Sequence, residues 1–135
     1  MPSELSSSKL CCHEDERARS YRILQAARDA AVTTRKYNST AVREDIVREF
    51  RERTGGKTPY DWQVDVAEAL LLGVDCTVIA GTGSGKTMPF VMPSFVEPSK
   101  VYFILSPLNA LESDQANRFD ALHVSAVVLN NTTYS

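Results

Sequence analysis

The chain has 135 residues, 43% of them apolar and 24% charged, an ordinary composition for one globular domain with a modest core. No run approaches 18 apolar residues and the N-terminus holds no apolar signal core, so we expect neither a membrane span nor a secretory leader. Three cysteines form no disulfide framework, and Cys11-Cys12-His13 lacks the spacing of metal ligands, so a reducing intracellular compartment fits best.

Charge is distributed unevenly along the chain. Residues 1–57 hold 12 Lys/Arg and 9 Asp/Glu, a net charge of +3, whereas residues 58–135 hold 3 Lys/Arg and 8 Asp/Glu, a net charge of −5. A nucleic-acid-binding domain usually has a basic face. Any nucleic-acid contact in the second half must therefore rest on backbone amides and a few polar side chains, or on parts of the molecule outside this chain.

The first 57 residues predict a helical N-terminal extension behind a short tail. Residues 1–13 are polar and rich in serine, so we expect them to be disordered. The composition of residues 14–36 favours a helix, and a cap signal at Asn38 introduces a second helix that ends at Gly55-Gly56. These helices carry most of the arginines. Because their charges are mixed in sign, we interpret them as a solvated face rather than a nucleic-acid-binding arm.

The second half, residues 58–135, alternates helices with apolar runs. A helix is predicted from Asp61 to Leu72, closed by Gly73, with an acidic side that includes Glu68. A helix beginning near Gly85 should kink or end at Pro93. Another helix is predicted over residues 108–122. Apolar runs at 75–80, where Cys76 should be a buried thiol, at 101–105 and at 124–129 read as strands. Strands alternating with helices predict an α/β fold with a parallel sheet.

Between the first strand and its helix lies AGTGSGKT, the pattern of a phosphate-binding loop. Glycine lacks a Cβ, so the backbone can take positive φ and turn its N–H groups toward a polyphosphate. We expect the Lys86 ammonium to reach the β- and γ-phosphates of ATP, and the Thr87 hydroxyl to complete the shell of a bound Mg²⁺. The alternative is a plain glycine turn with a solvated lysine. The residues assigned to the nucleotide are Ala80, Gly81, Thr82, Gly83, Ser84, Gly85, Lys86 and Thr87.

Three further segments resemble the RecQ-like helicases of superfamily 2. Gln63 lies 23 residues before Lys86, where those helicases carry a glutamine. Residues 106–111 read SPLNAL and are followed by Asp114-Gln115, which resembles their motif Ia; residues 129–133 read LNNTT and resemble their Leu-Asn-Ser-Thr stretch. DEAD-box RNA helicases, the nearest rival, carry a Pro-Thr-Arg-Glu-Leu-Ala type segment at motif Ia.

This resemblance covers residues 58–135 and implies the N-terminal part of the first RecA-like domain of an ATP-dependent 3′–5′ DNA helicase. It implies that Gln63 reads adenine, and that Lys86 and Thr87 serve ATP hydrolysis. It also implies a partner, single-stranded or duplex DNA rather than RNA, further helicase domains in the same protein, and a nuclear location in a eukaryote or a cytoplasmic one otherwise. The residues assigned to nucleic acid are Ser106, Pro107, Leu108 and Asn109.

The sequence departs from the RecQ pattern in two ways. Tyr60 stands where those helicases usually have an arginine, three positions before Gln63, which bears on adenine selectivity. The chain also contains no Asp-Glu-x-His segment to hold Mg²⁺ and no second RecA-like domain, so we expect a fragment with little turnover. The alternative is a non-catalytic nucleotide- or nucleic-acid-binding module derived from a helicase. An unrelated NTPase or kinase is a distant third.

Overall fold

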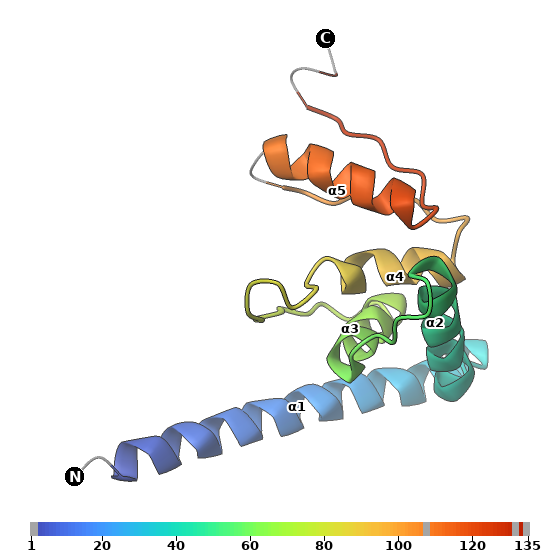
Figure 1. The fold of residues 1–135 in the computed structure, drawn as a ribbon. Coiled ribbons are helices and arrows are strands. Elements are labelled where there is room, and N and C mark those ends of the chain that lie inside the picture. Colours follow the sequence, from blue (N-terminus) through green and yellow to red (C-terminus); the bar gives the residue numbers. More distant parts are fainter. Residues whose placement is uncertain (1–2, 107–108, 131–132, 134–135) are drawn as a thin grey trace.

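The computed structural model describes residues 3–106, 109–130 and 133, and over these ranges it contains five α-helices (Figure 1). Their bounds are Ser3–Arg35 (α1), Ser39–Arg53 (α2), Asp61–Leu71 (α3), Met88–Val96 (α4) and Asn109–Ala121 (α5). Within these ranges, no helix combines the length and the apolar character that crossing a membrane requires.

Local sequence signals fix the ends of α2 and α3 as predicted. The Asn38 side chain accepts a hydrogen bond from the Ala41 N–H at 3.1 Å, which caps the start of α2. Gly55 follows α2 with a φ of 71°, and Gly73 follows α3 with a φ of 77°. Glycine adopts this left-handed conformation without steric cost, so both helices end where the chain supplies it.

One apolar core joins four of the helices. Figure 1 shows α4 lying between α3 and α5. Each of these helices turns one apolar stripe toward the shared core. The core therefore holds α4 in place, and with it the loop that precedes α4. Its buried members are Ile46 and Phe50 from α2, Val64, Ala67 and Leu71 from α3, Val91, Met92 and Phe95 from α4, and Phe119 with Leu122 from α5 and its end.

The predicted parallel sheet is wrong for the residues that the structure describes, because they contain no strand. Several apolar side chains of the segments predicted as strands lie in solvent: Ile79 is 95% exposed, Phe103 83% and Leu105 97%. A strand requires a hydrogen-bonded neighbour, and no backbone ladder joins these segments. Cys76, predicted to be a buried thiol, is likewise exposed. The observed fold is therefore helical, and the α/β RecA-like assignment is corrected.

Two helices also differ in extent from the prediction. α1 begins at Ser3, so residues 3–13, which were expected to be disordered, belong to this helix in the structure. α4 continues through Pro93 to Val96, so of the two predicted outcomes, a kink or an end at Pro93, the end is wrong. A proline lacks the N–H for one helical bond, but α4 is short and the Pro93 side chain is fully buried.

The arginines of the N-terminal extension do not form a uniformly solvated face. Glu68 of α3 is fully buried, and it receives a bidentate contact from Arg28, with Nε–Oε1 at 3.0 Å and Nη2–Oε2 at 2.6 Å. Arg43 Nη1 donates to Oε2 at 2.8 Å. The hydroxyls of Tyr37 and Ser39 both donate to Oε1. One carboxylate thus attaches α1 and α2 to α3, and we call these five residues the Glu68 cluster.

The pKa of Glu68 reflects this cluster. Burial alone would raise it, but the hydrogen bonds from Arg28, Ser39 and Arg43 outweigh burial and lower the pKa from 4.5 to about 2. Because the folded-state pKa lies below the ordinary value, ionised Glu68 stabilises the fold fully above pH 4.5. That contribution is lost as the pH falls toward 2.

We therefore expect the contribution of Glu68 to the free energy of unfolding to be lost in acid. The measurement is the free energy of unfolding in urea for the wild type and for Glu68→Gln, across the window from pH 4.5 down to 2. The difference between the two proteins should be largest above pH 4.5 and should shrink toward pH 2, because the Glu68 carboxylate becomes protonated as the pH approaches its folded-state pKa. A difference that stays constant over this window would contradict the assignment.

Arg53 connects the extension to the last helix. Its Nη1 donates to the carbonyls of Leu122 at 2.9 Å and His123 at 3.2 Å, which are free acceptors at the end of α5. The same guanidinium lies over the ring of Phe95 in α4, 4.7 Å from its centroid, and pairs with Glu49 at 3.3 Å. α5 is thereby fixed by its C-terminal end.

Candidate nucleotide-binding loop

The phosphate-loop pattern lies at the start of α4, in the tight loop at the left of Figure 1. Gly83 has a φ of 78° and Gly85 a φ of 76°, on either side of Ser84. The Ser84 N–H donates to the Gly81 carbonyl at 3.3 Å, and the Ser84 hydroxyl donates to the same oxygen at 2.5 Å. Alternating left-handed residues of this kind build concave backbone sites for anions, and only glycine takes this conformation without strain.

Lys86 and Thr87 stand between this loop and α4. The Lys86 side chain is exposed and forms no hydrogen bond or ion pair with the rest of the described chain. Thr87 is the half-buried N-cap residue, and its hydroxyl makes no capping bond. α4 begins at Met88 rather than near Gly85. At its start the Met88 N–H donates to the Gly85 carbonyl at 3.2 Å, and the Phe90 N–H donates to the Thr87 carbonyl at 3.2 Å. An ammonium, a hydroxyl and the positive end of a helix thus follow one another at the loop.

Gln63 reaches the loop from α3. The residue is buried, its Oε1 accepts from the Tyr60 N–H at 2.9 Å, and its Nε2 donates to the Gly85 carbonyl at 2.9 Å. A Cβ built on Gly85 would lie 2.7 Å from Nε2. The structure therefore brings together two site residues far apart in sequence, through a bond to the loop backbone. That Gln63 reads adenine stays a prediction, and both ends of its amide are already in use.

The expected nucleic-acid segment is described only in part. Ser106 and the backbone of Asn109, the first residue of α5, belong to the described residues, whereas Pro107 and Leu108 lie outside them. The assignment of these four residues to a phosphate backbone stays a prediction. α5 begins at Asn109, so the positive end of this helix lies at this segment.

A slot beside the loop was missed by sequence reasoning. It is a cavity of about 490 Å³ between α3 and the segment that leads into the loop. Trp62 and Val66 line one wall, residues 77–80 line the other, and Gly81 with Ser84 close it at the loop. The sequence placed Trp62 only on the apolar side of its helix. The signal that could have found the slot is the single tryptophan of the chain beside Gln63.

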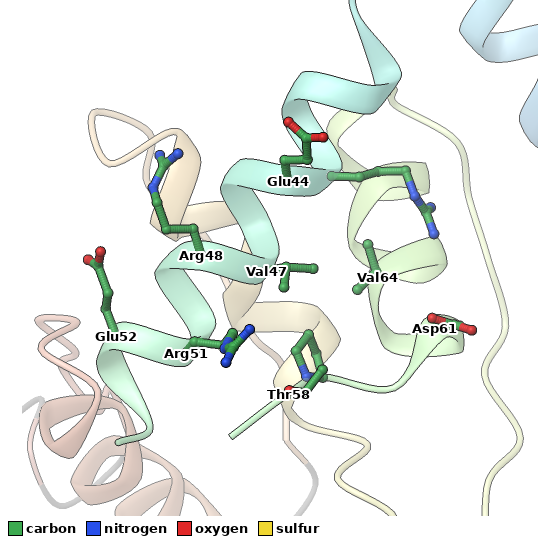
Figure 2. Close-up of a pocket in the computed structure, with 10 residues that line it drawn as sticks. Glu44, Val47, Arg48, Arg51, Glu52, Thr58, Asp61 and Val64 are labelled. Atoms are coloured by element: carbon green, nitrogen blue, oxygen red, sulfur yellow. The ribbon is translucent and has the colours of Figure 1, made fainter. Parts of the chain in front are cut away.

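A second cavity, of about 630 Å³, lies between α2 and α3 (Figure 2). Figure 2 shows Val47 and Val64 facing each other across it, with charged residues of α2 around the opening. None of its lining residues belongs to the loop, and two of its three arginines are already paired, Arg43 with Asp65 and Arg48 with Asp45. Its charge is therefore mixed, and it offers no concentrated site for a polyphosphate.

Comparison with known proteins assigns the family. The profile of the DEAD/DEAH box helicases matches residues 60–134, more than half of the chain and including the loop, α4 and α5. The chain belongs to the DEAD/DEAH box helicase family.

Individual relatives confirm the resemblance to RecQ-like helicases. The chain is similar to the RecQ-like DNA helicase BLM of Xenopus laevis, with 33% identity over 50% of this chain and 5% of that protein. It is similar to the ATP-dependent DNA helicase Q-like SIM of Arabidopsis thaliana, with 33% identity over 61% of this chain and 9% of the relative.

A third relative is a DEAD-box RNA helicase, from the group that is the nearest alternative to the RecQ-like helicases. The DEAD-box ATP-dependent RNA helicase 35A of Oryza sativa subsp. japonica is 37% identical over 58% of this chain and 12% of its own length. The chain thus spans no more than about an eighth of these relatives, and it corresponds to a segment of a helicase. No solved structure matches it.

Proposed function

We propose that this chain is the ATP-binding segment of a RecQ-like DNA helicase, with the loop of residues 80–87 holding the triphosphate. The observation that carries the proposal is the loop geometry: two left-handed glycines around Ser84, followed by a helix start and by a lysine with no partner among the described residues. Membership of the helicase family supports it. An intracellular location, nuclear in a eukaryote, accords with this function.

Each loop residue has a separate part in this proposal. Backbone N–H groups between Gly81 and Gly85 surround the phosphates, and Lys86 neutralises their charge. The Thr87 hydroxyl, which makes no capping bond, would serve as a ligand of Mg²⁺. When bound, the metal adds charge neutralisation at the phosphate oxygens. Gln63 belongs to the site through its bond to Gly85, and adenine reading would use the second N–H of Nε2 and the second lone pair of Oε1.

The test is the affinity for ATP in the presence of Mg²⁺, measured by calorimetry. Lys86→Ala should weaken binding by roughly 10- to 100-fold, since a hydrogen bond to a charged group is worth about 1.5–3 kcal/mol. Its side chain is exposed and unpaired, so the substitution should leave the fold intact. Lys57→Ala removes an equally exposed lysine outside the loop and is the control. Equal ATP affinity for wild type and Lys86→Ala would refute the proposal.

DNA is the proposed nucleic-acid partner, on the strength of the RecQ-like segments at residues 106–111 and 129–133. The N-terminus of α5 would meet a sugar-phosphate backbone there. A binding competition between single-stranded DNA and RNA of the same sequence measures which of the two the chain prefers. Tighter binding of RNA would favour the DEAD-box RNA helicases over the RecQ-like ones.

A further inference from the structure

The contacts that attach α1 to the other helices come from its C-terminal half. Figure 1 shows α1 passing along α3, with its N-terminal part projecting away from the rest of the molecule. Residues 13–23 are all exposed, and among the residues whose burial the structure describes, the buried side chains of α1 are Leu24 and Ala31. Neither belongs to the core that the other four helices share. Lifting α1 from the molecule therefore leaves that core intact.

The groups that hold α1 lie on one row of α3. We call this row, which consists of Asp65, Glu68 and the Leu71 carbonyl, the α1 seat. Residues three apart share one face of a helix, and all three groups accept hydrogen bonds. Their contacts with α1 are a hydrogen bond from the Tyr21 hydroxyl to Asp65 Oδ2 at 2.8 Å, the ion pair of Arg28 with Glu68 at 2.6 Å, and a hydrogen bond from Arg35 Nη2 to the Leu71 carbonyl at 3.1 Å. The seat thus recognises a helix that supplies donors at these positions.

The short link between α1 and α2 contains a strained residue. Lys36 has a φ of 53°, in the left-handed region. Its N–H donates to the Val32 carbonyl and the Tyr37 N–H donates to the Ala31 carbonyl, both at 3.2 Å, so α1 ends in the left-handed turn that glycine normally forms. A lysine is strained there, whereas it is a good former of right-handed helix. If residues 36–38 became helical, the strain would be relieved and α1 and α2 would form one helix over residues 3–53.

Such a continuous helix would carry α1 away from the seat of its own chain. We propose that α1 exchanges between two copies of this chain, so that each α1 occupies the α1 seat of the other copy. Every contact between α1 and the seat is then reproduced, and Arg28 of one copy completes the Glu68 cluster of the other. Exchange of an identical element is a low-cost route to a dimer, and a short strained hinge favours it. The exchange does not depend on nucleotide binding.

The first test is the dimer dissociation constant of the 135-residue chain, measured by sedimentation equilibrium. We expect a dimer whose fraction rises with protein concentration. Lys36→Gly should weaken dimerisation by at least about 10-fold, because the left-handed conformation costs a lysine a factor of roughly 5–30 at each hinge and costs glycine little. Lys57→Gly is the matched control, since Lys57 is an exposed loop lysine outside the left-handed region. It should leave dimerisation unchanged.

A second variant should shift the equilibrium in the opposite direction. The Asn38 side chain caps α2 only while α1 and α2 are separate helices, since it accepts from the Ala41 N–H at the start of α2. Asn38→Ala removes this cap from the closed monomer and lets a continuous helix run through the hinge. Dimerisation should therefore become several-fold stronger. A variant that merely loosened the fold would not produce opposite effects from Lys36→Gly and Asn38→Ala.

Cross-linking decides whether the dimer is formed by exchange. Tyr21→Cys and Asp65→Cys are introduced together into a chain whose own three cysteines are replaced by serine, and a short bismaleimide joins the two new thiols. The isolated dimer should give covalent dimers in a denaturing gel, and the monomer should give only a cross-link within one chain. Three results would overturn the proposal: cross-links within one chain only in the dimer, Lys36→Gly dimerising like the wild type, or both the wild type and Asn38→Ala remaining monomeric up to their solubility limit.

Discussion

Replacing Glu68 by alanine is expected to lower the free energy of unfolding by roughly 3–5 kcal/mol, the range for breaking a buried ion pair from one side. The substitution leaves Arg28 and Arg43 facing each other without their shared carboxylate. These arginines are 21% and 28% exposed, so water can reach them and the lower end of the range applies. The hydroxyls of Tyr37 and Ser39 would also lose their acceptor.

The measurement is urea unfolding followed by Trp62 fluorescence. Asp45→Ala is the matched control, because Asp45 pairs with Arg48 at 2.7 Å but both side chains are about half exposed. An exposed pair contributes about 0–1 kcal/mol, so the control should change stability little. If Glu68→Ala were no more destabilising than Asp45→Ala, the attachment of α1 and α2 to α3 through this carboxylate would be wrong.

The pairing of Glu68 with distant arginines could not be predicted from the sequence. The sequence pattern placed Glu68 on the acidic side of its helix, and we interpreted the arginines of the extension as a solvated face. Arg28 and Arg43 lie 40 and 25 residues from Glu68, and helical periodicity reports only neighbours three or four positions apart. A pairing across such distances depends on how helices pack, which a local pattern does not encode. The interpretation of a solvated face is therefore wrong for these two arginines.

Sequence signals correctly predicted the features that depend only on neighbouring residues, such as helix caps and glycine conformations. The Asn38 cap and the closing glycines at 55 and 73 predicted the ends of α2 and α3. The left-handed conformations at Gly83 and Gly85 agree with the expectation that glycine there permits positive φ. The apolar runs at 75–80, 101–105 and 124–129 failed as strands, because strand formation is a property of pairs of segments. An apolar run predicts a strand only if another segment supplies its hydrogen-bonding partner.

The second large effect that we expect is self-association of the chain through residues 101–105. Phe103 and Leu105 are nearly fully exposed on an extended backbone without a ladder, and Val101 is 78% exposed. Unpaired extended backbone with apolar side chains is a template for pairing with other chains. We expect the wild type to aggregate as its concentration rises and to show a broad thermal transition.

Introducing lysine at both Phe103 and Leu105 should suppress this aggregation severalfold, as measured by light scattering against concentration. Because both side chains are exposed, the double substitution should change the free energy of unfolding by no more than about 0.5 kcal/mol per site. The control introduces lysine at Ile23 and Val32, which are 48% and 53% exposed on α1. It adds the same charge and also removes two apolar side chains, but on a helix whose backbone groups are already bonded. If the control suppresses aggregation as strongly as the 103/105 pair, the added charge is the cause and the extended segment is not the site of self-association.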